Sequence, residues 1–532
     1  MNAYFSRIFP LKPWLSAAVS GLLLALSFPK PGLSIFAWIA FLPLFYSVRG
    51  KTFKRSFQLG WLTGFTAYCG IFYWLNIVMT TYGKLPLIIS ICLTLLMAAY
   101  LALYPALALA CSRSAENGSV PQVIAFPILW VSLEYVRAYL LSGFPWALLG
   151  YTQYRTLPII QIADLTGVYG VSFLILVVNV FLFQLWRWVR GKDGALYPFL
   201  STAVALPLLV LSIWYGFVSL NKEAVGREIK VALAQGNIPQ DIKWNPAFQE
   251  DTVAIYERLS RRTKGTAVDL IVWPESSLPF FFQKELIYSA RVSSLARETG
   301  ASLVVSSPAL EQSNGRELLL NSAFMIAPDG STVGRADKVH LVPFGEYVPL
   351  AKLLPFVKKM VEGIGDFSPG SGIVPLQATT CKAGILICFE GIFPEISREY
   401  VVKGADLLVN ITNDAWFGDS SAPYQHLSMT VFRAVENRVP LVRSANTGVT
   451  AVIDSRGHIR GMTELFREAL LTGSVRVGSE RSFYTERGDI FAWICLLTSL
   501  AVLISAALHA KRSGGKDTGS PAESPDKNQI SA

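Results

Sequence analysis

Eight apolar segments divide this chain into a part suited to lipid and a part suited to water. They run roughly over residues 14–28, 35–48, 59–79, 85–109, 122–140, 168–186, 197–217 and 490–507. A helix needs about 20 apolar residues to cross the hydrocarbon core of a bilayer. Most of the segments meet that length, and the first two are shorter. The sequence therefore predicts a polytopic α-helical membrane protein with about eight spans.

The composition agrees with a chain that hides much of its surface in lipid. Of the 532 residues, 52% are hydrophobic and only 16% are charged, and the mean hydropathy is +0.41. Soluble globular domains carry about 25% charged residues. A soluble protein of this length is therefore excluded, whereas a membrane part joined to a soluble part fits.

The basic residues show which way the chain faces. They gather in four places, at Arg7 and Lys12, at Arg49, Lys51, Lys54 and Arg55, at Arg187, Arg190 and Lys192, and at Lys511, Arg512 and Lys516. All four places lie on one side if every segment crosses, and basic loops stay in the cytoplasm. Because topology explains the net charge of +10, nucleic acid is not expected as a partner.

This orientation predicts four regions. Residues 1–226 form a transmembrane domain of about seven helices, and residues 227–481 form a soluble domain on the side opposite the cytoplasm, which is the periplasm in a diderm bacterium. Residues 482–510 form the last transmembrane helix. Residues 511–532, rich in Gly, Ser, Pro and Lys, form a disordered cytoplasmic tail because they lack apolar residues.

Between the seventh and eighth segments the pattern changes to alternating strands and amphipathic helices. The predicted strands are 229–235, 270–273, 302–306, 322–327, 383–389 and 407–411, and the predicted helices are 250–263, 289–299 and 424–438. Residues 439–445 and 450–454 have the pattern of a hairpin. Strands that alternate with helices indicate an α/β layer fold.

Cysteine and histidine usage gives no sign of a metal or a disulfide framework. Three of the six cysteines lie in the apolar segments and Cys111 lies just beyond one, no CxxC pair occurs, and the four histidines are far apart in the sequence. Zinc sites need closely spaced Cys and His ligands. We therefore expect neither a metal nor another cofactor.

Three reactive side chains lie at or just beyond the ends of apolar strands, where α/β folds commonly place their sites. They are Glu275, Lys338 and Cys388. A thiol becomes a nucleophile when a base takes its proton, and a carboxylate is a candidate base. An ammonium group, together with the N–H of Phe389 after the nucleophile, stabilises an oxyanion. Taken singly, each residue also has a plain structural explanation, as a core cysteine, a helix-terminal carboxylate or a solvated lysine.

The order of these residues and their neighbours resembles the nitrilase or carbon–nitrogen hydrolase superfamily. The matching blocks are Trp273-Pro274-Glu275, Lys338 with Pro343-Phe344-Gly345-Glu346, Ile387-Cys388-Phe389-Glu390 and Asn410-Ile411-Thr412-Asn413-Asp414. The resemblance implies a Glu-Lys-Cys triad in an αββα sandwich. With membrane segments on both sides, and with residues 235–240, Lys243-Trp244, 341–349 and 144–151, the chain further resembles the apolipoprotein N-acyltransferase family.

That resemblance implies the last step of lipoprotein maturation. A fatty acyl chain passes from a membrane glycerophospholipid to the N-terminal amine of an S-diacylglyceryl-cysteine apolipoprotein, through a thioester on Cys388 in a ping-pong sequence. Glu275 is the expected base, and Lys338 and the Phe389 N–H hold the oxyanion. Glu346 is expected to orient Lys338, and Glu390 to hold the pocket, although either is also consistent with a structural ion pair.

Apolar residues near these motifs are candidates for lipid contact. Phe280 and Phe281 follow Glu275, and Phe356 lies in a second apolar run at residues 353–357. Exposed phenylalanines beside a site suggest lipid-contacting arms, whereas ordinary helix core is the alternative. Trp244 and Trp146 complete the predicted substrate-binding set.

Two other functions use the same features. A membrane-tethered amidase or nitrilase would have the same triad and let water resolve the thioester, and the apolar arms favour a lipid substrate over it. A non-enzymatic binding or transport protein would not need an intact Glu275, Lys338 and Cys388. Transporters also tend to carry inverted repeats, and none is evident in the sequence.

Overall fold

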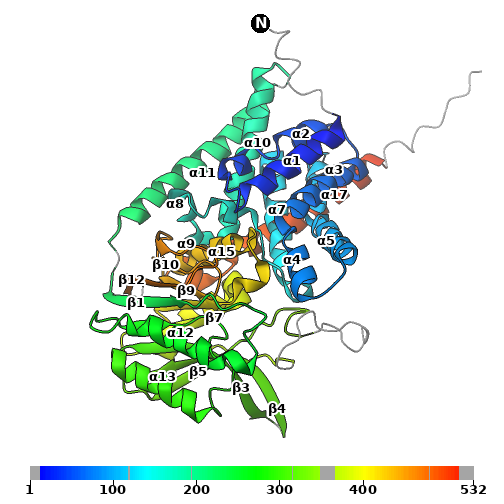
Figure 1. Cartoon of the computed structure of the whole chain (residues 1–532). Coiled ribbons are helices and arrows are strands. Elements are labelled where there is room, and N and C mark those ends of the chain that lie inside the picture. The colour runs from blue at the N-terminus through cyan, green and yellow to red at the C-terminus, as the bar shows by residue number, and fades with distance from the viewer. Residues whose placement is uncertain are drawn as a thin grey trace, which may run out of the picture.

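The computed structural model describes residues 12–117, 120–192, 194–223, 225–313, 315–347, 366–478 and 480–514. A helical part lies against an α/β part, and the chain returns to the helical part at its carboxyl end (Figure 1). The predicted tail, residues 511–532, begins too early, because residues 511–514 continue the last helix. Residues 515–532, and Phe356 with its apolar run, lie outside the described residues.

Each of the eight predicted apolar segments is helical in the structure. The main helices are α1 (Pro13–Ser27), α2 (Leu42–Val48), α3 (Phe53–Phe72), α5 (Leu87–Leu101), α6 (Leu103–Asn117), α7 (Gln122–Tyr139), α10 (Val168–Val189), α11 (Leu196–Asn221) and α17 (Ile490–Gly514). Shorter helical elements join them: η2 (Ser34–Trp38), α4 (Leu75–Ile77), η3 (Val78–Tyr82), η4 (Leu140–Ser142), η5 (Leu149–Gln153), α8 (Leu157–Ile160) and α9 (Ala163–Thr166). Exposed apolar side chains cover much of α5, α11 and α17, as a lipid-facing surface requires.

The predicted number of eight spans is not confirmed. Among the described residues, five helices are long and apolar enough to cross a membrane. A sixth results if Phe53–Phe72 and Leu75–Tyr82, which meet at a 54° bend, form one broken span. The first two segments are the reason for the difference, because α1 has 15 residues and rises only about 22 Å, less than the hydrocarbon thickness.

The α/β part consists of two six-stranded sheets. One has the order β12-β1-β2-β3-β4-β5 and the other the order β11-β10-β9-β8-β7-β6. The strands are β1 (Arg227–Gln235), β2 (Leu270–Val272), β3 (Ser302–Ser313), β4 (Arg316–Ile326), β5 (Thr332–Asp337), β6 (Leu376–Gln377), β7 (Lys382–Ile387), β8 (Leu407–Thr412), β9 (Leu441–Ala445), β10 (Ala451–Ile453), β11 (Ile459–Met462) and β12 (Ala469–Val477). The predicted strands and the late hairpin are present, and β3 and β4 are longer than predicted.

Helices cover the outer face of each sheet, which makes an αββα sandwich. α12 (Gln249–Arg261) and α13 (Leu286–Thr299) pack on the first sheet, whereas α14 (Pro394–Val402) and α15 (Ala422–Asn437) pack on the second. The remaining short elements are η6 (Pro246–Phe248), η7 (Cys388–Ile392), η8 (Asp414–Phe417) and α16 (Phe483–Arg487). In Figure 1, α15 lies between the second sheet and the helical part, and one continuous core joins the two. Parallel central strands such as β8, buried at every position, need cover on both faces.

Candidate active site

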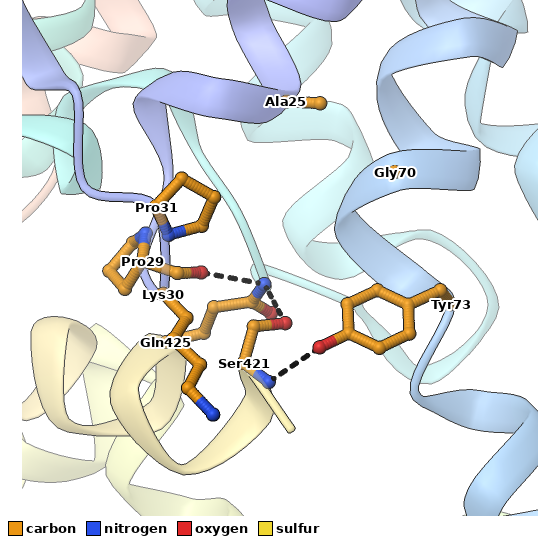
Figure 2. A pocket seen from close by; sticks show the side chains of 8 residues that line it. All are labelled: Ala25, Pro29, Lys30, Pro31, Gly70, Tyr73, Ser421 and Gln425. Atoms are coloured by element: carbon orange, nitrogen blue, oxygen red, sulfur yellow. Dashed lines mark hydrogen bonds between the residues drawn. The ribbon is translucent and has the colours of Figure 1, made fainter. Parts of the chain in front are cut away.

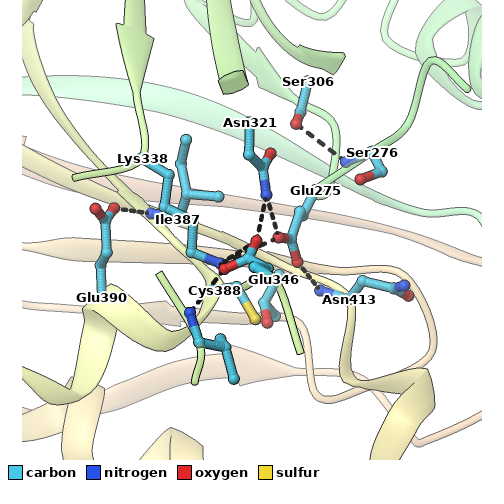
Figure 3. A network of polar contacts seen from close by, with 12 residues as sticks. Glu275, Ser276, Ser306, Asn321, Lys338, Glu346, Ile387, Cys388, Glu390 and Asn413 are labelled. Carbon is cyan, nitrogen blue, oxygen red and sulfur yellow. Dashed lines mark hydrogen bonds and ion pairs between the residues drawn. The ribbon is translucent and has the colours of Figure 1, made fainter. Parts of the chain in front are cut away.

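The predicted catalytic residues lie where strands end. Glu275 follows β2, Lys338 directly follows β5, and Cys388 directly follows β7. In β1-β2-β3 and in β7-β8-β9 the strands are parallel, so their carboxyl ends lie at one edge of each sheet. The two sheets face each other, and the side chains of Glu275, Lys338 and Cys388 gather in one region between them (Figure 3).

Lys338 lies between two carboxylates. Its Nζ donates to Glu346 at 2.9 Å and lies 3.6 Å from Oε1 of Glu275. The side chain of Lys338 is only 1% exposed. Burial alone lowers the pKa of Lys338, but the negative charges of Glu346 and Glu275 outweigh it and raise the pKa above its ordinary value. The ammonium group is therefore a fixed positive charge at the site.

An asparagine missed by the sequence analysis joins the two carboxylates. Asn321 on β4 donates from Nδ2 to Glu275 at 2.9 Å and to Glu346 at 3.1 Å. The second oxygen of Glu275 accepts from the backbone N–H of Asn413 at 3.0 Å, and Glu346 accepts from the N–H of Val342 at 2.9 Å. Both carboxylates are thus held in place from several sides.

Lys243 is a second buried ammonium group beside Glu275. Its Nζ donates to the main-chain oxygen of Glu275 at 3.0 Å, and the residue is 1% exposed. Burial lowers the pKa of Lys243 to about 8, opposed by attraction to Glu275. In the sequence, Lys243 stands in a motif shared with the family, but a role was predicted only for its neighbour Trp244. Trp244 is half-buried.

Cys388 begins η7 with a left-handed backbone, at φ +53°. Non-glycine residues adopt this region rarely, and it is often found at functional sites. Burial and the charge of Glu275 together raise the pKa of the Cys388 thiol to about 12, against the opposing charge of Lys338. The resting thiol therefore keeps its proton at neutral pH and needs a base at the moment of reaction.

Glu390 supports the backbone on both sides of the site. One oxygen accepts from the N–H of Val339 at 2.7 Å and of His340 at 3.2 Å, and the other accepts from the N–H of Ile387 at 2.7 Å. Burial raises the pKa of Glu390 to about 7, and these three N–H groups oppose that rise. Glu390 therefore ties the segment after Lys338 to the segment before Cys388.

Phe389 and Trp146 belong to an aromatic cluster that joins the two parts of the protein. Their rings stack with centroids 6.5 Å apart, and the ring of Phe417 lies 6.0 Å from that of Trp146. Trp146 is 1% exposed and donates from Nε1 to Gln425 at 2.8 Å. Trp146 thus comes from the helical part and lies close to the nucleophile's neighbour.

The predicted exposed arm after Glu275 is wrong at Phe280. Its side chain is 6% exposed and packs in the core under α12 and α13, where its ring lies 4.7 Å from that of Tyr288. Alternation along the chain is the physical reason, because Leu278, Phe280 and Phe282 all point into this core. Phe281, on the opposite side, is half-buried.

A separate cavity of about 320 Å³ lies at the junction of α1, α3 and the start of α15 (Figure 2). Its walls are Ala25, Pro29, Lys30, Pro31, Gly70, Tyr73, Ser421 and Gln425. Figure 2 shows the Tyr73 hydroxyl accepting from the N–H of Ser421, at 3.1 Å. None of the three candidate catalytic residues lines this cavity.

Comparisons with known proteins match both parts of the chain. The family model described as "Apolipoprotein N-acyltransferase N-terminal domain" matches residues 20–181, and the model "Carbon-nitrogen hydrolase" matches residues 230–484. An apolipoprotein N-acyltransferase of Geobacter metallireducens is 58% identical over 503 residues, which cover 94% of this chain and 96% of that protein. One of Methylococcus capsulatus is 35% identical and covers 90% and 93%. A solved carbon–nitrogen hydrolase from Helicobacter pylori G27 is 18% identical, with a TM-score of 0.37, and covers 52% of this chain and 94% of its own.

The α/β part, with its two packed sheets and its Glu, Lys and Cys at the strand ends, is a carbon–nitrogen hydrolase domain. A helical membrane part precedes it, and a further apolar helix follows it. The sequence identity and coverage of the relatives show to which family this combination of parts belongs. The chain belongs to the apolipoprotein N-acyltransferase family, a family of membrane acyltransferases.

Proposed function

We propose that this protein transfers a fatty acyl chain from a glycerophospholipid to the N-terminal amine of an S-diacylglyceryl-cysteine apolipoprotein. The observation that carries the proposal is the position of Lys338 between Glu275 and Glu346, beside a cysteine with a strained backbone. The apolar helices fused to this site support a lipid as the acyl donor, and the names of the relatives support the acceptor.

In the first half-reaction, Glu275 takes the thiol proton and the sulfur of Cys388 attacks the ester carbonyl carbon. The negative charge that develops on the carbonyl oxygen is stabilised by the Lys338 ammonium and the N–H of Phe389. When the intermediate collapses, the C–O bond breaks and the leaving oxygen takes the proton from Glu275. The products are a lysophospholipid and a thioester on Cys388.

In the second half-reaction, the amine of the apolipoprotein attacks the thioester carbonyl. The same two donors hold the new oxyanion, and Glu275 accepts a proton from the attacking nitrogen. The C–S bond breaks, an amide forms, and the sulfur regains a proton from Glu275. The sequence is ping-pong because the lysophospholipid leaves before the amine reacts.

Other predicted residues have supporting roles in this proposal. Glu346 orients Lys338 through the 2.9 Å contact, and Glu390 holds the backbone next to the nucleophile. Trp146, Trp244 and Phe281 contact the acyl chain or the polypeptide of the acceptor. Phe356 has the same proposed role, from outside the described residues.

The proposed topology has the catalytic domain, residues 227–481, on the periplasmic side of the inner membrane. The helical character of all eight apolar segments and the one-sided basic loops support it. α1 and the η2–α2 segment are too short to cross the bilayer even when they stand perpendicular to it. They would complete eight spans only where the bilayer is locally thinner. Residues 1–226 and 482–510 are the membrane regions, and residues 511–532 are cytoplasmic.

Intact-protein mass spectrometry after incubation with phospholipid alone tests the proposal. We expect a fatty-acyl adduct that hydroxylamine removes and that maps to Cys388, present in a control with the exposed Cys92 replaced by alanine and absent in Cys388→Ala. Addition of a diacylglyceryl peptide should then discharge the adduct to the amine. An adduct formed with a small amide, and none with any phospholipid, would instead support a membrane-tethered carbon–nitrogen hydrolase.

A further inference from the structure

The main-chain oxygen of the nucleophile is held by two buried side chains. His426 Nε2 lies 3.2 Å from the carbonyl oxygen of Cys388, and Asn410 Nδ2 donates to the same oxygen at 3.4 Å. His426 is 1% exposed and Asn410 is fully buried. Neither residue belongs to the Glu275, Lys338 and Cys388 triad.

The contacts of His426 fix which ring nitrogen carries the proton. The main-chain oxygen of Cys388 can only accept, so Nε2 carries the hydrogen that faces it. Nδ1 faces both a donor, Arg443 Nη2 at 3.1 Å, and an acceptor, Asp414 Oδ1 at 3.3 Å. Burial and the charge of Arg443 both lower the pKa of His426, opposed by Asp414, so the ring is neutral at pH 7.

The same arginine fixes the orientation of Asn410. Arg443 Nη1 donates to Oδ1 of Asn410, so the Nδ2 group must face the other way. There it donates to the main-chain oxygens of Leu386, at 2.9 Å, and of Cys388. Arg443 is itself held by Asp414, whose Oδ2 lies 2.6 Å from Nη2. One buried guanidinium thus contacts both residues whose side chains meet the Cys388 oxygen.

The Cys388 oxygen and the Phe389 N–H belong to one peptide unit. A trans peptide is planar, and its C=O and N–H bonds point in opposite directions. When His426 and Asn410 hold the oxygen on one side, the N–H of Phe389 is directed to the other side, away from His426. A non-glycine residue adopts the left-handed backbone of Cys388 only where its surroundings hold it, and these two contacts supply such support.

We propose that His426 is a positioning residue that aims the Phe389 N–H at the oxyanion, through the peptide unit shared with Cys388, and that Asn410 assists it. The inference rests on the proposed function only in assuming that an oxyanion forms at Cys388. It assigns no proton transfer to His426, whose Nε2–H is committed to the Cys388 oxygen.

The neighbouring residue seats this histidine against the helical part. Gln425 accepts from Trp146 Nε1 at 2.8 Å and from Trp74 Nε1 at 3.2 Å, and it donates to the main-chain oxygen of Ile71 at 3.1 Å. The rings of Trp146 and His426 lie 5.6 Å apart. The peptide that carries the Phe389 N–H is thereby braced by contacts that reach the membrane helices.

Two reactions of the Cys388 thiol distinguish a His426 that positions the Phe389 N–H from a His426 that only supports the fold. Iodoacetamide alkylates the thiolate at a saturated carbon without forming an oxyanion, whereas a p-nitrophenyl ester acylates it through one. In His426→Leu we expect alkylation of Cys388, over a range of pH, to stay within about twofold of wild type. Acylation should fall between about tenfold and a thousandfold, as when an oxyanion donor is lost.

Two further variants make the result decisive. His426→Gln keeps an N–H₂ group near the position of Nε2 and should restore acylation to within about tenfold of wild type. Thr430→Val, at another buried position of the same helix, serves as a packing control and should change neither reaction. An equal loss of both reactions in His426→Gln, or unchanged acylation in His426→Leu, would overturn the inference.

The p-nitrophenyl ester also separates this inference from the proposed function. If wild-type protein is acylated by the ester but by no phospholipid, the lipid donor is wrong while the His426 comparison still holds. If His426→Leu reacts normally with both ester and phospholipid, the positioning role is wrong while the acyl transfer stands.

Discussion

Lys243 Nζ donates to the main-chain oxygen of Glu275 at 3.0 Å, which places a second buried cation beside the catalytic carboxylate. Within the part of the chain that the structure describes, Lys243 has no carboxylate in ion-pair contact. Lys338 and Lys243 together balance the charges of Glu275 and Glu346. A carboxylate pair with only one lysine would leave a net negative charge against which a thiolate must form.

Replacing Lys243 with methionine should slow acylation of Cys388 by about tenfold or more, because one unit of positive charge near the developing thiolate and oxyanion is lost. Single-turnover acylation by a p-nitrophenyl ester measures the effect. Lys230→Met, which removes an exposed lysine from β1, is the matched control and should react as wild type does. Normal acylation in Lys243→Met would show that charge balance is unimportant.

The same lysine predicts a pH dependence of stability. Its pKa is lowered to about 8 in the folded protein, against about 10.4 in an unfolded chain, so the unfolded state binds more protons between these values. Stability contributed by this group therefore rises with pH from about 8 to about 10. In detergent, the melting temperature of wild type relative to Lys243→Met should increase between pH 7.5 and pH 9.5. A constant difference would contradict the prediction.

Glu275→Gln should have opposite effects on two reactions of Cys388. The charge of Glu275 raises the pKa of the thiol, so its removal lowers that pKa and speeds alkylation by iodoacetamide at pH 8 to 9. Acylation by an ester should fall by about a hundredfold or more, because the proton acceptor is gone. Glu317→Gln, on an exposed part of β4, controls for the loss of a carboxylate. Slower alkylation in Glu275→Gln would contradict the assigned electrostatics.

Glu390→Gln should destabilise the protein although the two side chains have nearly the same shape. Both carboxylate oxygens accept from backbone N–H groups, and an amide puts its own N–H₂ against at least one of them. A buried donor left without an acceptor costs about 1–3 kcal/mol. Chemical denaturation monitored by tryptophan fluorescence should report the loss, and acylation should slow as the backbone at Cys388 shifts. Unchanged stability would mean that the carboxylate is already protonated.

Much of this arrangement was open to prediction because it lies in local patterns. Glu275 and Cys388 each follow an apolar run, and strand ends in α/β folds are where sites form. Lys338 follows the more polar segment Arg335-Ala336-Asp337, and the block Pro343-Phe344-Gly345-Glu346 beside it pointed to it. The alternation of strands and helices indicated an α/β layer fold, and the resemblance to the carbon–nitrogen hydrolase superfamily implied the sandwich. The strands β5, β6, β11 and β12, and the polar ends of β3 and β4, were not predicted, because strands at the edges of a sheet depend on their neighbours more than on their own composition.

The residues that support the site were harder to find because they are distant in sequence. Asn321, 46 positions from Glu275, has no motif around it, and only the pairing of β4 with β3 and β5 brings it there. Lys243 and Asn413 stand inside the motifs that resemble the family. The neighbouring sequence does not show that Lys243 donates to the main-chain oxygen of Glu275, or that the Asn413 N–H donates to its carboxylate. Phe280 was predicted to contact lipid but is buried. An apolar run has the same sequence pattern whether it packs in a core or lies against a membrane.

A buried ion pair at the far end of α15 joins the catalytic domain to the helical part. Arg438 donates from Nε at 2.9 Å and from Nη2 at 2.6 Å to one oxygen of Asp164, which lies on α9. That oxygen also accepts from the hydroxyl of Tyr215 on α11, at 2.7 Å. Because α15 carries His426, loosening its carboxyl end should weaken the link between the membrane helices and the site.

Replacing either partner alone should therefore cost about 3–5 kcal/mol of stability, because it leaves the other charge buried and unpaired. Asp164→Leu and Arg438→Met each test this, and the double variant should lose less than the sum of the two.

We further expect acylation from phospholipid vesicles to fall more than acylation by a soluble p-nitrophenyl ester, since the triad itself is untouched. Glu399→Gln, which breaks a solvent-exposed pair with Lys403, is the control and should change each reaction little. Equal losses with both acyl donors would show that the pair supports the catalytic domain alone and not its attachment to the membrane helices.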